Sequence, residues 1–583
     1  MRRVMLWLAV WATTQCGLAP ARGADRPSAA GHWQGTIKAG GTALTMVFHV
    51  DDAGGKLAAT FDSPDQGSTG IPVDSAAVVG DELTFAIRGL RGDFKGKLDS
   101  GGTEAVGTWT QAGKATPLTL KKTATPTALV IPAGLVGTWE GKLKVGATDL
   151  RIGLKVESRQ DGTKVAGFSS PDQGANFLPI TAIALDGKAV TAESRAIGAK
   201  FAGTLDAAKG EIVGTWTQGG TPFPLTFKKA DKVSEPRRTQ VPKPPFPYRS
   251  EDVAYPNRAA GISLAGTLTV PEGKGPFPAA LMITGSGAQD RDETLLGHKP
   301  FLVIADALSR RGIAVLRVDD RGVGKSTGSQ ESATSADFAG DVEAGVAYLK
   351  SRPEVDPKAI GLIGHSEGGL IAPMVAARSD DIGYIVLLAG TGIDGAEILR
   401  MQGQLILKAA GASEAALKAQ ARLLDDIVAV LRAEADEKAI AVKLEGLAKS
   451  AVALIPEAER KTLGDVAETM VKAQLERVNT PWFRYFLGYD PKANLAKVRC
   501  PVLAINGGND LQVPPKENLA AIEAALKAGG NARVTIRELP GLNHLFQKSK
   551  TGSPSEYATI EETIDPSVLT LLADWIAATT GRR

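Results

Sequence analysis

Cysteine and histidine are both scarce in this chain of 583 residues, which contains two cysteines, Cys16 and Cys500, and five histidines. Two cysteines are too few for a disulfide framework or a cysteine-ligated zinc site, so neither can organise the fold. The histidines, aspartates and glutamates form no cluster with the spacing of a metal site, and we expect the protein to need no metal or other cofactor. The scarcity of histidine also leaves few candidates for a catalytic base.

An excess of charge and a long hydrophobic run are missing as well. The 67 Lys and Arg residues nearly balance the 64 Asp and Glu residues, so the composition gives no reason to expect a nucleic-acid partner. The apolar run Val4–Ala12 falls short of the ~20 residues that a membrane-spanning helix needs. It follows Arg2 and Arg3 and precedes several small residues, which is the layout of a secretory signal peptide over residues 1–24. We therefore expect a secreted or periplasmic protein without a stable membrane anchor.

An internal repeat organises the part of the chain that follows. The sequence FDSPDQG at 61–67 returns as FSSPDQG at 168–174, and GTWTQ, first found at 107–111, returns with the same offset. Between these marks, short runs of alternating apolar and polar residues are broken by glycine-rich turns, a pattern that predicts antiparallel strands. We expect two copies of one all-β module, at 25–125 and 131–230, whose repeated turns are either binding loops or structural turns.

A different pattern follows the repeats, as expected of a chain longer than the ~250–300 residues of one hydrophobic core. Residues 231–250 contain five prolines, which predicts an extended linker. From 251 to 583, continuous apolar runs such as Ala279–Ile283 alternate with stretches of helical composition. This alternation predicts a mostly parallel sheet covered by helices on both faces. Residues 393–498 interrupt it with a segment rich in Ala, Leu, Lys and Glu, which predicts several helices inserted between two strands.

The sequence Gly364-His365-Ser366-Glu367-Gly368 directly follows the apolar run 360–363 and opens a stretch of helical composition. In a strand–turn–helix setting, the pattern G-x-S-x-G holds its serine on a sharp, strained turn with the hydroxyl exposed. Ser366 is therefore the predicted nucleophile. The residue that follows it, Glu367, is expected to offer its backbone N–H to the oxyanion that forms when an acyl group is attacked.

A serine hydroxyl is a poor nucleophile until a base removes its proton, so a histidine must be within reach. His544 is the only histidine after Ser366, and it lies in a loop directly behind the apolar run 534–539. His365 adjoins the serine in a turn that should direct its side chain elsewhere. Asp510 lies in the loop after the preceding apolar run, and it is the predicted carboxylate that orients the base.

This order of nucleophile, carboxylate and base resembles the α/β-hydrolase superfamily over about residues 250–580. Asp319–Ser326 looks like the loop after that superfamily's fourth strand. The segment Thr284–Gly287 stands at the place of its histidine–glycine oxyanion loop, with Thr where His is usual. The resemblance implies that the backbone N–H of Ser286, or that of Gly287 in its place, is the second oxyanion donor.

The inserted helices take the place of a lid in such a hydrolase. Their end, Thr480–Phe486 followed by Tyr489–Pro491, is similar to that of bacterial serine esterases related to the serine aminopeptidase branch. Trp482, Phe483 and Phe486 in this segment either line an acyl pocket or form the core of the lid.

We therefore expect an α/β-hydrolase domain with a helical lid, preceded by two all-β modules, that cleaves small-molecule carboxylic esters through an acyl-enzyme on Ser366. A peptidase with the same triad is one alternative, and it would need an acidic residue such as Asp292 to hold a substrate amine. A binding protein whose repeats carry the function is the other. The cluster Asp290, Arg291 and Asp292 is expected to form salt bridges with Arg321 rather than to line the site.

Overall fold

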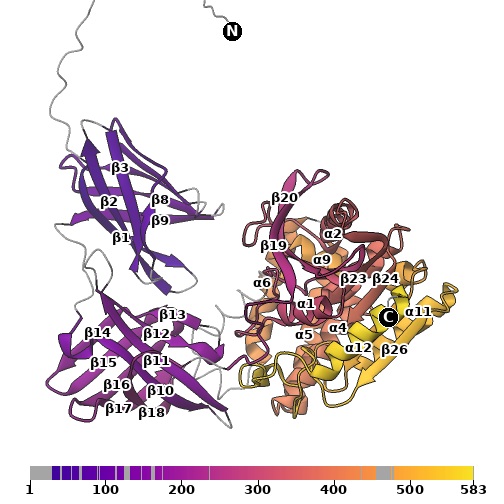
Figure 1. Ribbon diagram of the computed structural model, residues 1–583. Coiled ribbons are helices and arrows are strands. Elements are labelled where there is room, and N and C mark those ends of the chain that lie inside the picture. Colours follow the sequence, from indigo (N-terminus) through magenta and orange to yellow (C-terminus); the bar gives the residue numbers. More distant parts are fainter. Residues whose placement is uncertain are drawn as a thin grey trace, which may run out of the picture. The chain divides into compact units, whose positions relative to one another are not determined.

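The chain divides into two compact units, Met1–Ala128 and Leu129–Arg583 (Figure 1). The predicted signal peptide at 1–24 lies outside the residues that the structure describes. The computed structural model describes residues 29–581 except 40–41, 54–55, 65–67, 88–89, 91, 112–113, 124–130, 146–147, 159–163, 174, 219, 235–236, 435, 455–474 and 476–477.

The first unit contains one antiparallel sheet of nine strands, in the order β4-β3-β2-β1-β9-β8-β7-β6-β5. Its core is aromatic, because Trp33, Phe48, Phe85, Phe94 and Trp109 are all almost fully buried. The strands are β1 (Gly31–Ala39), β2 (Thr42–Ala53), β3 (Lys56–Ser63), β4 (Ser68–Pro72), β5 (Ser75–Val79), β6 (Glu82–Ile87), β7 (Gly92–Leu98), β8 (Glu104–Gln111) and β9 (Lys114–Thr123).

The second unit begins with a sheet of the same design, in the order β13-β12-β11-β10-β18-β17-β16-β15-β14. Each strand has its counterpart nine strands earlier, as the sequence repeat predicts. The strands are β10 (Gly137–Val145), β11 (Thr148–Ser158), β12 (Lys164–Ser170), β13 (Ala175–Pro179), β14 (Ala182–Asp186), β15 (Ala189–Ser194), β16 (Ala199–Asp206), β17 (Glu211–Gln218) and β18 (Thr221–Ala230).

The repeated segments have structural explanations. A Cβ on Gly107 would lie 2.1 Å from the carbonyl oxygen of Lys95, and one on its counterpart Gly214 would lie 2.3 Å from that of Ala202. In the second copy of the S-P-D-Q-G turn, Asp172 is buried and Oδ2 accepts the backbone N–H of Arg151 at 2.6 Å. These contacts favour packing as the reason that the segments recur.

A third sheet follows, of eight strands in the order β19-β20-β22-β21-β23-β24-β25-β26. Strands β21 to β26 are parallel, and β19 and β20 are antiparallel to their neighbours. The strands are β19 (Tyr248–Asn257), β20 (Ile262–Pro271), β21 (Phe277–Ile283), β22 (Ala314–Val318), β23 (Val355–His365), β24 (Tyr384–Leu388), β25 (Val502–Gly507) and β26 (Val534–Leu539).

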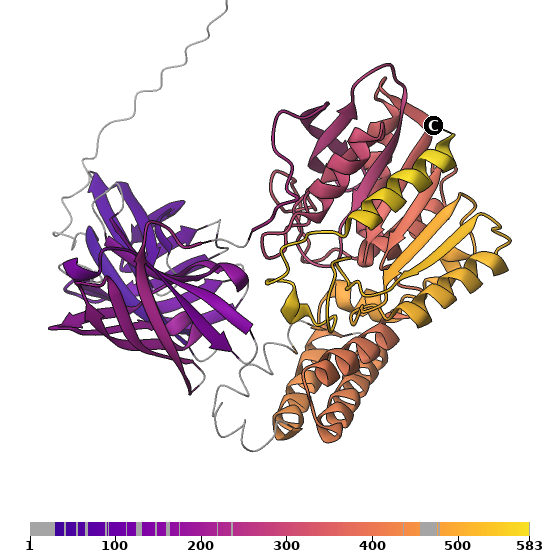
Figure 2. The same cartoon turned by 60° about the horizontal axis from the view of Figure 1, so that its bottom comes forward.

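Helices cover both faces of this sheet (Figure 2). Residues of α2 (Ser335–Lys350), α3 (Glu367–Ala376) and α11 (Pro515–Ala528) share one hydrophobic cluster with alternate residues of the strands. Residues of α1 (Pro300–Arg310) and α12 (Pro566–Thr580) form a second cluster with the intervening strand residues. The predicted fold class is confirmed: a mostly parallel sheet with helices on both faces, the arrangement expected of an α/β-hydrolase domain, follows two all-β modules.

Between β24 and β25 the chain forms a separate helical layer. In the residues of this layer that the structure describes, the helices are α4 (Gly395–Ala409), α5 (Glu414–Ala433), α6 (Glu437–Leu454) and α9 (Pro481–Gly488), followed by the short α10 (Lys492–Leu495). Helices α4, α5, α6 and α9 contribute to a hydrophobic cluster that is distinct from the two clusters of the sheet. These helices occupy the place in the chain where a lid is predicted.

The proline-rich segment before β19 is tied to the hydrolase domain. The guanidinium of Arg238 donates to the carbonyl oxygens of Ile560, Leu296 and Ala558 at 2.7–3.0 Å. Gln240 exchanges hydrogen bonds with the backbone of Ile564. These residues therefore contact the hydrolase domain and do not form a linker without docking contacts.

This anchoring predicts that Arg238→Ala lowers the melting temperature of the protein. Hydrogen bonds from a charged group contribute ~1.5–3 kcal/mol each, so we expect a loss of several degrees by calorimetry. The adjacent Arg237 is exposed, and Arg237→Ala serves as the matched control, with an unchanged melting temperature. Equal melting temperatures for the two variants would show that the contacts of Arg238 contribute nothing.

Candidate active site

Ser366 lies in the turn between β23 and α3, and its backbone has φ 53° and ψ −112°. A left-handed φ is strained for a residue that carries a side chain. The glycines on either side have no room for one. A Cβ on Gly364 would lie 2.0 Å from the carbonyl oxygen of Gly368, and one on Gly368 would lie 2.2 Å from that of Ile283. The pattern G-x-S-x-G is thus required here by sterics.

His544 and Asp510 approach each other from the loops after β26 and β25. Nδ1 of His544 lies 2.7 Å from Oδ2 of Asp510, while Oδ1 of Asp510 accepts the backbone N–H groups of Gln512 at 2.8 Å and Val513 at 2.9 Å. The side chain of Asp510 is fully buried. Because a carboxylate only accepts, Nδ1 of His544 carries the hydrogen and Nε2 is left as a base.

The loop of His544 also contacts the turn of the serine. The imidazole rings of His544 and His365 lie 4.8 Å apart, and the carbonyl oxygen of His544 lies 3.1 Å from Nε2 of His365. Within the described residues, no hydrogen bond joins the hydroxyl of Ser366 to Nε2 of His544. In free enzymes this contact often tightens only when substrate binds. The structure therefore brings the three predicted triad residues to one region.

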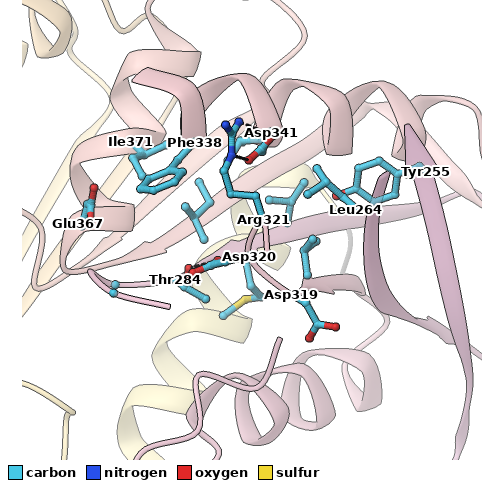
Figure 3. A pocket seen from close by; sticks show the side chains of 17 residues that line it. Tyr255, Leu264, Thr284, Asp319, Asp320, Arg321, Phe338, Asp341, Glu367 and Ile371 are labelled. Carbon is cyan, nitrogen blue, oxygen red and sulfur yellow. Dashed lines mark hydrogen bonds and ion pairs between the residues drawn. The ribbon is translucent and has the colours of Figure 1, made fainter. Parts of the chain in front are cut away.

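The oxyanion loop, residues 284–287, is held by two acidic side chains. The hydroxyl of Thr284 donates to Oδ1 of Asp320 at 2.7 Å, and the N–H of Gly285 donates to Oε1 of Glu293 at 2.7 Å. Figure 3 shows the contact between Thr284 and Asp320. Burial raises the pKa of Asp320 to about 7, although this carboxyl accepts hydrogen bonds. The loop is thus anchored even though Thr stands in place of His.

The predicted oxyanion donors are not engaged elsewhere. Among the residues that the structure describes, no acceptor takes the backbone N–H of Ser286 or of Glu367. Glu367 is the first residue of α3, so its N–H has no partner within the helix and lies at the positive end of the helix dipole. Both groups are available to an oxyanion.

The charged residues beyond the oxyanion loop form ion pairs, but not the cluster expected from the sequence. Arg321 belongs to a different pair, with Asp341 of α2, so its predicted bridge to the cluster is wrong. Asp292 contacts two cations, Arg317 and Lys299, and has no free charge with which to hold a substrate amine. The other pairs are Arg291 with Asp319 and Arg291 with Asp252.

The side chain of Glu367 has a place that sequence reasoning did not anticipate. It is buried and accepts hydrogen bonds from the hydroxyl of Ser335 at 2.6 Å and from the indole N–H of Trp482 at 2.7 Å. Burial raises the pKa of Glu367. The residue predicted to supply an oxyanion donor therefore also contacts α9, in the predicted lid. Neither this contact nor those of Glu293 has a signature in the local sequence.

The three aromatic residues proposed for the acyl pocket lie in different surroundings. Trp482 contacts Glu367 and stacks on Phe486, with ring centroids 5.4 Å apart. Phe486 is buried in the hydrophobic cluster of the sheet, and Phe483 packs against that of the lid. Of the three, Trp482 is the one that contacts a residue beside the nucleophile.

A cleft extends from the oxyanion loop towards β19 and α2 (Figure 3). Its walls combine apolar side chains such as Leu264, Phe338 and Ile371 with the carboxyl groups of Asp320 and Glu367. The cleft reaches the predicted oxyanion loop at Thr284, Gly285 and Gly287, and it reaches α3 at Glu367 and Ile371.

Two features are absent from the part of the chain that the structure describes. In the described residues, no group of three or more His, Cys, Asp or Glu side chains is arranged to hold a metal ion. No helix in the described part of the chain is long and apolar enough to cross a membrane.

Comparison with known proteins identifies hydrolases. The sequence profile of the X-Pro dipeptidyl-peptidase (S15) family matches residues 260–538. Esterase EstD of Thermotoga maritima is 27% identical over 389 residues, which cover 64% of this chain and 78% of that protein. Among solved structures, the α/β hydrolase GrgF of Penicillium sp. sh18 has a TM-score of 0.34 at 20% identity, covering 57% of this chain and 99% of that one. Est1E of Butyrivibrio proteoclasticus, solved with ferulic acid, has a TM-score of 0.33 at 17% identity, covering 56% and 99%.

The triad geometry predicts that Ser366→Ala and His544→Ala each reduce turnover of a p-nitrophenyl ester by several orders of magnitude, with an unchanged circular dichroism spectrum. Asp510→Asn is expected to cost less, because it mainly misorients the histidine. If His544→Ala kept more than about a tenth of the wild-type rate, another group would have to be the base, since each triad member normally supplies far more than tenfold.

The raised pKa of Asp320 predicts a pH-dependent stability. In the folded protein this carboxyl keeps its proton up to about pH 7, whereas in the unfolded chain it loses it near pH ~4. The free energy of unfolding therefore falls between these values as pH rises. Asp320→Asn removes this contribution. The melting temperature of the variant minus that of wild type should therefore increase from pH 4 to pH 7. Asp380→Asn, at an exposed position, is the control. Parallel curves for Asp320→Asn and wild type would contradict the assignment.

The surroundings of the lid aromatics predict two different effects. Phe486→Ala should lower the melting temperature strongly, because truncating a buried phenylalanine costs ~3–5 kcal/mol. Phe483→Ala should affect stability less, because Phe483 is only partly buried. If Phe483 lines the acyl pocket, its removal shifts preference towards longer acyl chains by ~1–3 kcal/mol. An unchanged chain-length profile in this variant assigns Phe483 to the lid core.

Proposed function

We propose that this chain, a serine hydrolase of the α/β-hydrolase superfamily, acts on carboxylic esters of small molecules. The observation that carries this proposal is the similarity to esterase EstD, which extends over 389 residues. The contacts of Asp510, His544 and the oxyanion loop supply the chemistry that ester cleavage needs.

The proposed reaction has two halves. Ser366 Oγ attacks the ester carbonyl carbon while Nε2 of His544 takes the hydroxyl proton. The tetrahedral intermediate collapses, the C–O bond to the alcohol breaks, and His544 gives its proton to the leaving alcohol. Water then attacks the acyl-enzyme with His544 again as base, and the acid leaves Ser366 free. Asp510, 2.7 Å from Nδ1 of His544, stabilises the imidazolium that forms twice in this cycle.

The negative charge on the attacked oxygen is the costly feature of both halves. The N–H groups of Ser286 and Glu367 supply the two donors in this proposal, and each such donor contributes ~3–4 kcal/mol. These donors stabilise the oxyanion most when their positions are fixed before the reaction begins. The bonds from Thr284 to Asp320 and from Gly285 to Glu293 provide that fixation for the loop.

A peptidase of the X-Pro type is the second candidate, because the profile of that family matches residues 260–538. Such an enzyme must bind a substrate amine. Asp292 is already paired with Arg317 and Lys299, so it is not available for this purpose. Two other carboxyl groups near the oxyanion loop, Asp320 and Glu367, have raised pKa values through burial, which favours their neutral forms over the charge that an ammonium group needs.

Parallel assays of the full chain test the choice. We expect kcat/KM for p-nitrophenyl acetate and butyrate to exceed that for Gly-Pro p-nitroanilide and for amino-acid p-nitroanilides. A higher kcat/KM for the X-Pro anilide would replace the esterase by the peptidase. A binding protein is the remaining alternative, and it predicts no turnover of either substrate and no labelling of Ser366 by a fluorophosphonate probe.

The proposed place of action is outside the cytoplasm. The support for it is the charged start, apolar run and small residues of the first 24 positions, which together have the layout of a signal peptide. Detection of mature protein that begins after residue 20 in a periplasmic or secreted fraction would support this, and an intact N-terminus in the cytoplasm would contradict it.

A further inference from the structure

His365, the residue before the nucleophile, has a partner at each ring nitrogen. Nδ1 lies 2.9 Å from Oε1 of Glu293, and Nε2 lies 3.1 Å from the backbone carbonyl oxygen of His544. The side chains of His365 and Glu293 are 9% and 8% exposed. The reaction described above gives His365 no role, and it uses Glu293 only as the acceptor that holds the N–H of Gly285.

The partners determine the protonation state of the ring. A carbonyl oxygen has no proton to donate, so Nε2 of His365 must carry a hydrogen. Oε1 of Glu293 accepts the N–H of Gly285 at 2.7 Å, and as a carboxylate oxygen, which only accepts, it has a second lone pair for a hydrogen on Nδ1. With a hydrogen on both nitrogens, His365 is an imidazolium ion that faces an ionised Glu293.

The electrostatic balance agrees with this deduction. Burial by itself lowers the pKa of His365, but the charge of Glu293, its hydrogen bond and the bond to the carbonyl of His544 outweigh burial. The pKa of His365 therefore lies above its usual range. Each member of such a buried pair depends on the other, because removing one of them leaves an uncompensated charge.

Together the two side chains connect three separate parts of the site. One oxygen of Glu293 contacts both the oxyanion loop, at Gly285, and the nucleophile turn, at His365. His365 in turn contacts the loop of the base at His544. The spacing is close: a Cβ on Gly285 would lie 3.1 Å from Oε1 of Glu293 and 3.4 Å from Cβ of Ser366. A shift of either partner therefore moves the donors relative to the nucleophile.

The backbone of Glu293 is also unusual. Its φ is 52°, a left-handed conformation that costs free energy for a residue with a side chain. The turn is held by the N–H of Glu293, which donates to the carbonyl oxygen of Asp290 at 2.9 Å. Strain at a residue beside the reacting groups is a sign of a functional constraint.

We propose that Glu293 and His365 form a charged positioning pair that aligns the oxyanion loop, the nucleophile turn and the loop of the base. This inference rests on the proposed function, since it assigns to the pair the alignment of the same triad. The contacts of both side chains are with other parts of the protein, so we assign both as positioning residues. The pair acts through the geometry of Gly285 and His544.

The test measures the rate at which a fluorophosphonate labels Ser366 in the full-length protein. This reaction needs the nucleophile, the base and the oxyanion donors, but it is independent of the natural substrate. We expect Glu293→Gln and His365→Gln each to lower the labelling rate at least tenfold. In hydrolysis of p-nitrophenyl acetate, the loss should appear in kcat with little change in KM, because no substrate contact is removed.

A double variant shows whether Glu293 and His365 act as a pair or independently of each other. If the two side chains act as a unit, Glu293→Gln with His365→Gln is no slower than the slower single variant. It also removes both charges together, so it keeps the test decisive if a single variant unfolds. Losses that multiply in the double variant would overturn the proposal, and so would wild-type labelling rates in either single variant.

The pH profile gives a readout that a merely structural role would not change. His365 acts in its protonated form, so the wild-type rate should fall on the alkaline side as pH rises through its raised pKa. This alkaline limb should be absent in His365→Gln. Asp292→Asn is the control. Asp292 lies on the same loop as Glu293 and pairs with Arg317 of β22, so this variant should lower stability but keep the alkaline limb.

The failure of this inference differs from the failure of the proposed function. If wild type itself is not labelled by the fluorophosphonate, the proposed serine chemistry is wrong. If wild type is labelled and both variants react at the same rate, the serine chemistry stands and the positioning pair is wrong.

Discussion

The absence of space around Ser366 is the constraint on which the active site depends. Strand β23 runs directly into α3, and the turn between them approaches both the first turn of the helix and the end of β21 within van der Waals distance. A side chain at Gly364 or Gly368 would overlap backbone atoms. This packing forces Ser366 into a left-handed conformation and places the N–H of Glu367 beside the nucleophile. The same packing brings the end of β21, and with it the oxyanion loop, next to the serine.

The acidic side chains around this turn leave little net negative charge near the proposed oxyanion donors. Glu293, Asp320 and Glu367 lie near the oxyanion donors, and a negative charge there would oppose the oxyanion. Burial raises the pKa values of Asp320 and Glu367, which favours their neutral forms. Glu293 instead has His365 as its counter-ion. These acidic residues can therefore anchor the loop without repelling an oxyanion.

Several parts of this structure were predictable from local patterns. The nucleophile turn has its own signature, and the alternation of apolar runs with helical stretches identifies the sheet. Asp510 and His544 follow from the rule that catalytic groups lie behind the ends of parallel strands. The paired sheets of the modules follow from the repeat. Each of these inferences uses neighbours in sequence or a fixed order of elements.

The missed contacts are those between distant side chains. Glu293 and His365 are 72 residues apart, and nothing near either one in the sequence indicates the other. The expected bridge to Arg321 is wrong because Arg321 pairs instead with Asp341 on α2. The five prolines of residues 231–250 predict an extended linker, but Arg238 in this segment has three carbonyl partners that lie far along the chain. Such pairings depend on tertiary geometry.

The most direct test of the account is to trap the acyl-enzyme. The full-length protein is mixed with p-nitrophenyl acetate, quenched in acid within the first turnover and digested for mass spectrometry. The account predicts one acetyl group on the peptide that contains Ser366, and none on that peptide in His544→Ala. Turnover of the ester with no acetyl group on Ser366, or with the acetyl group on another residue, would contradict it.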